Sequence, residues 1–355
     1  MDAAPSRGIA PIRNPAATDA DADAGEPDAL GAATLAVWTR RAALERHTPG
    51  QVATFLRTGV WQSPWPGVLA DAGFVLDPRQ RAHAAVLASG GEGQPFPVPG
   101  AGQHSRVRSV AVGRTAARCW ELPLIDDDDP ATGACEHLLD DVSMPHHARP
   151  LQRTVDQGRR HELRRHRVTF RAGDVVRHPC GVFVSSPART VLDCAVLLPL
   201  EAAVCVVDAA LHRELVPPDV LAAGATARRG HPRARRLAEV LSLADGRAES
   251  PGETLARLLL RPILPELEPQ VRLLISGRLV ARFDLGDRSL RLAVEHDGRQ
   301  GHEGRAADDQ RRDAVSARQG WTTERVTWFD VRRRRAATVS RVVATADRIR
   351  RGAGG

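Results

Sequence analysis

Two turn signals near the C-terminus constrain the fold more than any other feature of the chain, because they divide one stretch into three short apolar strands. Ser276–Gly277 separates the first strand from the second, and Gly286–Asp287 separates the second from the third. The elements expected around them, in chain order, are a helix from Ser250, strands over 271–275, 279–284 and 290–297, a helix over 306–319, a strand from Trp321 and a last helix from Ala336. This order predicts a small α/β domain.

Acidic residues stand where two of these strands end. Asp284 closes the second strand, and the third strand ends in Glu295 and Asp297. Because side chains alternate along a strand, Glu295 and Asp297 point to the same face about 6.5–7 Å apart, and Asp284 converges with them if the two strands pair. Such carboxylates predict a site for Mg²⁺ or Mn²⁺, an ion that can activate water for phosphodiester hydrolysis. His302, which follows two glycines, is the candidate general acid or base.

Each polar residue of this region also has a structural interpretation that the sequence leaves open. Glu253 stands at the third position of a capping box, so it is expected to cap a helix and to act in the site only in addition. His296 alternates to the face opposite Glu295, and Asp287 is a typical turn residue. Arg312 is a candidate for contact with DNA or for an ion pair on a helix surface.

The segment RFDLGDRSLRLAVEHDGRQGH, followed by GWTTERVTW, resembles domain of unknown function 559 over about residues 249–330. That domain belongs to the Vsr-like (very-short-patch-repair) endonuclease branch of the PD-(D/E)XK superfamily. The resemblance implies a restriction-endonuclease-like α/β core, metal-dependent DNA cleavage, and site residues Asp284, Glu295, Asp297, His302 and the helix-borne Glu253. The chain contains no lysine, so His302, one residue further from its glycine than in the family, or Arg282 would supply the charge of the superfamily's lysine.

The N-terminal part predicts a second kind of module. Thr48-Pro49-Gly50-Gln51 reads as a capping box with proline at the first helical position, and it opens a helix through Arg57. A short helix precedes it, and two short strands around SPWPG follow it. Helix, turn, helix and hairpin together predict a winged helix-turn-helix, with Thr48, Gln51 and Arg57 as candidates for DNA contact. A small α/β cap without a DNA role is the alternative.

The pattern RTGVWQSPWPGVLA, then a helix, then TAARCWELPL resembles the N-terminal winged-helix region of AbiEi-type antitoxins over residues 34–124. This resemblance implies a DNA-binding regulator of a type IV toxin–antitoxin system, with a toxin partner encoded nearby. The expected organisation is a disordered lead-in over 1–33, the winged-helix domain over 34–124, a connecting α+β domain over 125–245 and the nuclease-like domain over 246–351.

The composition says less about the binding partners of this protein than the motifs do. The net charge of +7 and a pI near 10.4 suit an anionic partner, but all fifty basic residues are arginine, which also reflects a GC-rich coding sequence. No apolar run of about 18 residues predicts a membrane span, and no secretory signal precedes the first domain, so a cytoplasmic location is expected. The five cysteines show no C-x-x-C pair, so reduced thiols are expected.

The sequence therefore supports a multidomain α/β protein with two competing functions. The leading hypothesis is a metal-dependent DNA endonuclease guided by a winged-helix module. The alternative is a DNA-binding antitoxin or transcriptional regulator whose nuclease-like domain is catalytically degenerate, and a nuclease that acts on RNA is a third. Asp193 and Asp208, in two largely buried helices, are expected to be satisfied packing carboxylates.

Overall fold

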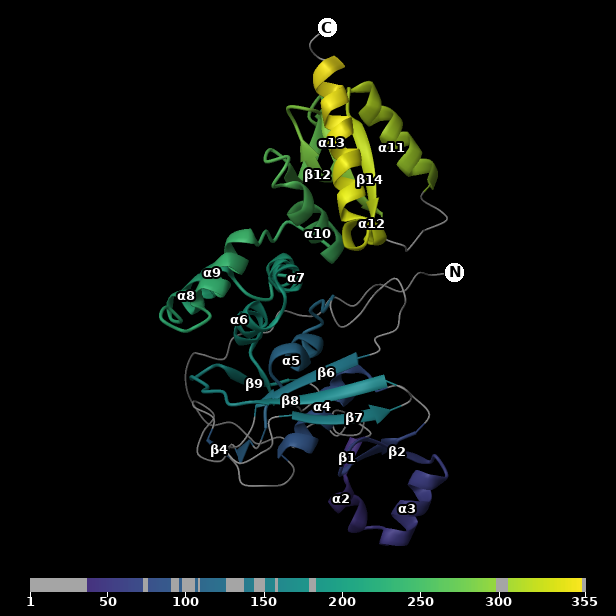
Figure 1. Ribbon diagram of the computed structural model, residues 1–355, viewed down its shortest axis with the longest axis vertical. Coiled ribbons are helices and arrows are strands. Elements are labelled where there is room, and N and C mark those ends of the chain that lie inside the picture. Colours follow the sequence, from purple (N-terminus) through teal and green to yellow (C-terminus); the bar gives the residue numbers. More distant parts are fainter. Residues whose placement is uncertain are drawn as a thin grey trace.

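The computed structural model describes residues 37–72, 76–90, 96–97, 106–107, 109–125, 137–143, 151–156, 159–178, 183–297 and 306–352. The described part is a mixed α/β protein with several small sheets arranged along a long axis (Figure 1). The segments proposed as a disordered lead-in (1–33) and as the glycine-histidine turn that contains His302 lie outside the described residues. None of the described helices is long and apolar enough to span a membrane.

At the N-terminal end, a three-stranded antiparallel sheet packs against two helices. The elements are β1 Val37–Thr39, α2 Arg40–Leu44, α3 Pro49–Arg57, β2 Trp61–Trp65 and β3 Val68–Asp71, with sheet order β1-β3-β2. The predicted capping box at Thr48 and Gln51 is confirmed, because each side chain accepts a hydrogen bond from the other residue's backbone N–H. The predicted hairpin is also confirmed, and Gly67 makes its turn at φ +83°.

The middle of the chain combines short sheets with a helical layer. Its elements are α4 Pro78–Gly90, β4 Phe96–Pro97, β5 Arg106–Val107, α5 Gly113–Cys119, β6 His137–Ser143, β7 Leu151–Asp156, β8 Arg159–His166, β9 Val175–Arg177, β10 Phe183–Ser185, α6 Pro187–Leu197, α7 Leu200–His212, α8 Pro218–Thr226 and α9 Ala234–Leu243. Strand β8 lies between β6 and β7. The expectation for Asp193 is confirmed, since its carboxylate pairs with Arg189 in the same helix.

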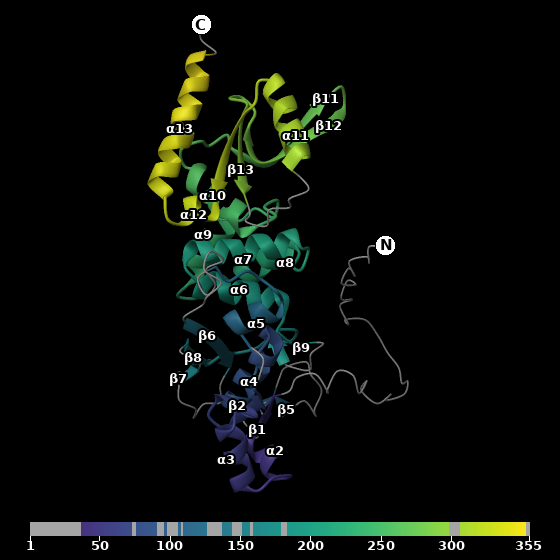
Figure 2. The same ribbon diagram turned by 90° about the vertical axis from the view of Figure 1, so that its right-hand side faces the viewer.

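The C-terminal part has the predicted order of elements with one correction: the stretch WTTERVTWFDV, predicted as a single strand, leaves the sheet after Thr327, where the Thr327–Asp330 capping box starts a short helix. The elements are α10 Pro251–Leu260, β11 Glu268–Ile275, β12 Arg278–Asp287, β13 Leu292–Asp297, α11 Ala306–Arg318, β14 Thr322–Thr327, α12 Trp328–Arg332 and α13 Arg335–Gly352. The sheet order is β11-β12-β13-β14; β13 and β14 are parallel and the other pairs antiparallel. Helices α10 and α13 lie on one side of this sheet and α11 on the other (Figure 2).

One boundary of the sheet differs from the sequence prediction. Strand β12 continues to Asp287, so Asp284 lies inside the strand rather than at its end. The turn comes after Asp287, whose Oδ1 accepts hydrogen bonds from the backbone N–H groups of Ser289 and Leu290. Asp287 is therefore a turn residue, as expected, but the turn that it stabilises follows Asp287 instead of being formed by Gly286–Asp287.

A single apolar core joins the central helices to the C-terminal sheet. It contains buried residues of α6 and α7, such as Val191 and Val206, together with Leu255 of α10, Val294 of β13 and Val342 of α13. Helix α10 therefore packs on both neighbours and connects the two parts of the molecule.

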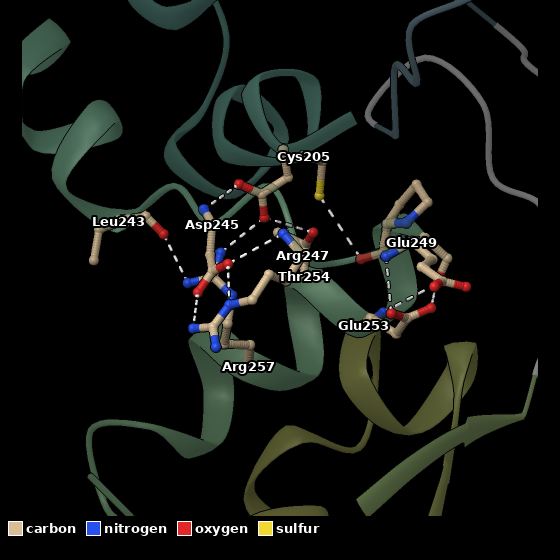
Figure 3. Close-up of polar contacts among 11 residues, drawn as sticks. Cys205, Leu243, Asp245, Arg247, Glu249, Glu253, Thr254 and Arg257 are labelled. Atoms are coloured by element: carbon tan, nitrogen blue, oxygen red, sulfur yellow. Dashed lines mark hydrogen bonds and ion pairs between the residues drawn. The ribbon is translucent and has the colours of Figure 1, made fainter. Parts of the chain in front are cut away.

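A buried ion pair reinforces this connection (Figure 3). Asp208 of α7 and Arg257 of α10 are each about 2% exposed, and Arg257 Nη2 donates to Asp208 Oδ2 at 2.8 Å. Thr254 Oγ1 donates to the same oxygen, and the backbone N–H of Asp245 donates to the other one. Arg257 also donates to the carbonyl of Leu243 at 2.7 Å. The expectation that Asp208 is a satisfied packing carboxylate is confirmed.

Replacing Arg257 with Leu is expected to lower the free energy of unfolding by about 3–5 kcal/mol, because Asp208 would stay buried without its counter-charge. The double variant Asp208→Asn/Arg257→Leu should recover a large part of that loss. Urea unfolding followed by circular dichroism measures both changes. Equal destabilisation by the single and double variants would contradict the importance of the pair.

Candidate functional site

The candidate site lies where strands β12 and β13 separate. Their pairing ends at Leu285 opposite Val294. Beyond this last pair, the backbone N–H of His296 in β13 donates a hydrogen bond to the side chain of Asp284 in β12, to Oδ2 at 2.8 Å. A side-chain carboxylate thus takes the place of the next backbone partner, and it fixes Asp284 at the fork between the strands.

Glu253 reaches this region from the first turn of α10. Its backbone N–H donates to Ser250 Oγ, and its Oε1 accepts from the same hydroxyl at 2.8 Å. Its Oε2 accepts from the backbone N–H of Glu249 at 2.9 Å and from Gln270 Nε2 at 3.1 Å. The predicted helix cap is confirmed, with Glu249 rather than Ser250 as the backbone donor to the Glu253 carboxylate.

Glu295 comes from β13 and points toward α11 and β14. The side chain is largely buried, and its Oε2 accepts a hydrogen bond from Arg312 Nη2 at 2.9 Å. Arg325, which stands opposite Glu295 in the parallel register with β14, lies 3.9 Å from the same oxygen. Arg325 also binds Asp313 of α11 at 2.6 Å.

The half-buried Asp284 raises the proton affinity of two buried acids, Glu253 and Glu295. Burial is the main cause that raises the pKa of Glu253, Asp284 and Glu295. The negative charge of Asp284 raises the pKa of Glu253 and of Glu295 further, although Arg312 opposes this for Glu295. The charge of Asp284 of β12 thus acts on Glu253 of α10 and on Glu295 of β13, and this repulsion has an energetic cost.

The other predicted site residues divide into those at the rim and those outside the site. Asp297 has a side chain that is 57% exposed, and it lies 3.9 Å from Arg325, so it shares the face of Glu295 as predicted but not its burial. His296 packs on the opposite face, against Gly252 of α10. Its buried Nε2 has no hydrogen-bond partner in the described part of the chain. Burial lowers the pKa of His296, which keeps its ring neutral at neutral pH.

The residues proposed for DNA contact have different surroundings. Thr48 and Gln51 are exposed but occupied with helix capping, whereas Arg57 is exposed in the last turn of α3. Arg312 is in contact with the acid cluster through Glu295.

Sequence patterns did not indicate one residue of the site, Gln270. It adopts φ +56° within β11, which interrupts the strand and turns its side chain toward Glu253. Its buried Oε1 has no hydrogen-bond partner among the described residues. A glutamine within an apolar strand gives no signal of such a conformation.

No ready-made metal centre is visible in the described ranges, where no three His, Cys, Asp or Glu side chains already form a group that could hold an ion. In this arrangement Glu295 is bound by Arg312, and Asp284 by the His296 N–H. The site as described is therefore an acid cluster partly neutralised by arginine.

Comparison with known proteins finds relatives whose names state no activity. No family model matches the chain. Two proteins from two strains of Mycobacterium tuberculosis, both named as uncharacterized, are each 31% identical to it over 185 residues, which is 51% of this chain and 68% of the relative.

Replacing Asp284 with Asn is expected to stabilise the fold at pH 7, because burial raises the pKa of the Asp284 carboxyl and its ionised form therefore opposes folding. Asn keeps the acceptor for the His296 N–H but removes the charge that disfavours the other two acids. Because the folded-state pKa of Asp284 is raised, the wild type loses stability as pH rises through that pKa. The gain should therefore vanish below about pH 4, where Asp284 is protonated in both states. Chemical denaturation between pH 3.5 and 8 tests this, and a destabilised variant at pH 7 would refute it.

Replacing Gly252 with Ala is expected to destabilise the fold by about 1–3 kcal/mol through overpacking. The added Cβ would lie 2.2 Å from the His296 ring, so the ring or the helix must move. The double variant Gly252→Ala/His296→Ala should be less destabilised than the sum of the single variants. Strict additivity in denaturant unfolding would show that the contact is unimportant.

Proposed function

We propose that this chain, which belongs to the family of these two mycobacterial proteins, is a metal-dependent endonuclease that hydrolyses phosphodiester bonds in DNA. Since the names of the relatives give no activity, the proposal rests on the side chains of this chain. The observation that carries the proposal is Asp284, which the His296 N–H holds at the fork between β12 and β13 and whose charge raises the pKa of Glu253 from α10 and of Glu295 from β13. Like charges brought together in a buried position destabilise a fold, and they recur where a function requires them.

The donor atoms suit a hard divalent cation. Mg²⁺ and Mn²⁺ prefer carboxylate and carbonyl oxygens, and one oxygen each of Asp284 and Glu295 makes no hydrogen bond within the described part. The buried amide oxygen of Gln270 is a further ligand of the right kind without a partner there. Asp284, Glu295 and Gln270 would hold the ion, and Asp297 at the rim would join them through water. When bound, Mg²⁺ lowers the pKa of water and neutralises charge on the leaving oxygen.

The protein's own residues supply orientation and charge. Glu253 fixes the start of α10 and the side chain of Gln270. Arg312 and Arg325 place two guanidinium groups beside Glu295, where they can bind a phosphate in a bidentate manner. His302 is proposed as the general acid or base on the sequence pattern alone.

The N-terminal module is proposed to guide this site to DNA. Its strand, two helices and hairpin follow the winged-helix order, and α3 exposes Gln51 and Arg57. On this proposal the protein acts in the cytoplasm, and α3 enters the major groove. A restriction-endonuclease-like core in the C-terminal sheet is part of the same proposal.

One observation favours a second function. Arg312 already neutralises Glu295 through a direct hydrogen bond, as an arginine would in a site that no longer binds metal. In that case the protein is a DNA-binding regulator or antitoxin, with a toxin partner encoded nearby, and the acid cluster only stabilises the interface between α10 and the sheet.

A cleavage assay with supercoiled plasmid and the purified full chain separates the two functions. Nicking is expected with Mg²⁺ or Mn²⁺ and not with EDTA. Asp284→Asn and Glu295→Gln should each lower the rate at least tenfold to about 100-fold, the range seen when metal surroundings are disturbed. Asp287→Asn, which removes an acid from the same strand outside the cluster, is the matched control.

A thermal-shift experiment gives a readout besides activity. A cation that binds only the folded chain stabilises it by about 2.7 kcal/mol at one hundred times its dissociation constant, and the two cluster variants should lose this shift. DNA binding by the wild type without nicking and without a metal-dependent shift would favour the regulator.

A further inference from the structure

Helix α12 begins at the edge of the sheet where the candidate site lies, beside α10 (Figure 1). In the parallel register of β13 and β14, Thr327 stands opposite Asp297, two positions after Glu295. Thr327 is also the N-cap of α12, so Phe329 follows only two residues later. Two residues span at most about 7.6 Å and neighbouring strands are about 4.8 Å apart, so the Cα atoms of Phe329 and Asp297 lie within about 12 Å of each other.

Phe329 exposes its ring to solvent at this edge. The residue is 45% exposed, and it is the aromatic member of the exposed large apolar side chains in the described ranges, whose other members are aliphatic. Its neighbour Trp328 packs against the main core instead. A single exposed apolar residue is common on protein surfaces, so the surroundings of the ring decide what it can bind.

The backbone that carries Phe329 is fixed on both sides. Thr327 Oγ1 accepts a hydrogen bond from the Asp330 N–H, and Asp330 Oδ2 accepts one from the Thr327 N–H. The carbonyl of Phe329 accepts from the backbone N–H groups of Arg333 and Arg334, at 2.8 and 3.2 Å. A ring on such a fixed segment can bind a flat ligand with little further loss of conformational entropy.

A guanidinium group lies over the Phe329 ring. The distance from Arg334 Cζ to the ring centroid is 4.9 Å, which is a cation–π contact. Arg334 is itself exposed, so this contact is at the surface and limits the orientations of the ring. The pair therefore presents an oriented aromatic ring beside a positive charge.

The sequence around this pair is basic. Residues 332–335 are all arginine, and residues 331–346 contain no acid. Arg335 forms an ion pair with Glu201 through two hydrogen bonds. Asp330, which precedes the run, is engaged in the capping box of α12. An exposed aromatic ring among arginines is typical of surfaces that bind single-stranded nucleic acid, where bases stack on the ring and cationic side chains contact the backbone.

We propose that the Phe329 ring, oriented by Arg334, is a stacking platform for an unpaired base of the DNA strand that enters the candidate site. The inference rests on the proposed function for its choice of DNA, and it narrows the substrate class. The strand at the site is locally single-stranded, as in a flap, a bubble or a frayed end, because a base inside a duplex must be unstacked before it can reach a protein ring.

The test measures binding by the full chain in EDTA, so that cleavage plays no part. Fluorescence anisotropy compares a labelled single strand of about 20 nucleotides, longer than the site of one single-strand-binding module, with a duplex of the same sequence. Phe329→Ala is expected to bind the single strand about tenfold more weakly or worse and the duplex within about twofold of the wild type. The slope of log K against log salt should not change, because stacking neutralises no phosphate.

Matched variants isolate the aromatic face. Phe329→Trp keeps such a face and should bind the single strand at least as tightly as the wild type. Phe329→Leu keeps an apolar side chain without a π-system and should lose affinity as Phe329→Ala does. Leu279→Ala removes an apolar side chain that is 50% exposed on the β11–β12 hairpin, and it should retain the affinity of the wild type.

The fluorescence of 2-aminopurine placed in the single strand gives a readout of stacking itself. It should be quenched when the strand binds the wild type or Phe329→Trp, and less so when it binds Phe329→Leu at saturating protein. Equal quenching by these three proteins would overturn the inference.

The outcomes separate this inference from the proposed function. If Phe329→Ala binds the single strand like the wild type while the wild type still nicks plasmid, only the stacking inference is overturned. If affinity falls as expected but no metal-dependent nicking is found, the stacking platform stands and the nuclease fails. An equal loss for single strand and duplex, or full affinity in Phe329→Leu, would also overturn the inference, because the effect would not belong to base stacking.

Discussion

The buried pair of Asp208 and Arg257 is the interaction on which the arrangement of the C-terminal half depends. Each group would be costly to bury alone, and the two together fix α10 against α7. The hydrogen bonds from Arg257 to Leu243 and from Asp245 to Asp208 tie the intervening segment to the same point. Burial still raises the pKa of Asp208 in spite of Arg257, so the pair provides geometry more than stability. Because α10 also begins with Glu253, that geometry reaches the candidate site.

The acidic side chains of the candidate site are poorly compensated, whereas the buried acids in the rest of the core are well compensated. Elsewhere, each buried acid discussed above has a cation or several donors, as Asp208 has. At the fork of β12 and β13, Asp284 has a single backbone donor and two acidic neighbours whose pKa its charge raises. A fold that tolerates such a cluster gives up stability there, which is the pattern expected when a local arrangement serves binding or chemistry.

The sequence predicted the elements of the C-terminal part well, because its turns and caps are local signals. Ser276–Gly277, the cap at Ser250 and the stop at Gly320 act over a few residues and hold in any surroundings. The site was predicted less completely because it depends on pairing between distant residues. The displacement of Asp284 from the strand end, the left-handed Gln270 and the position of Arg325 opposite Glu295 all follow from tertiary packing and register, which no local pattern encodes.

The distribution of charge around the site connects these observations. Six carboxylates, those of Glu249, Glu253, Asp284, Glu295, Asp297 and Asp313, surround the fork, whereas three guanidinium groups, those of Arg282, Arg312 and Arg325, pair with them. His296 adds no charge because burial keeps it neutral. A chain with a net charge of +7 thus concentrates negative charge at one place. Coulombic repulsion among these acids would be relieved by a small cation at the fork, which is the ion that the proposed hydrolysis of phosphodiester bonds needs.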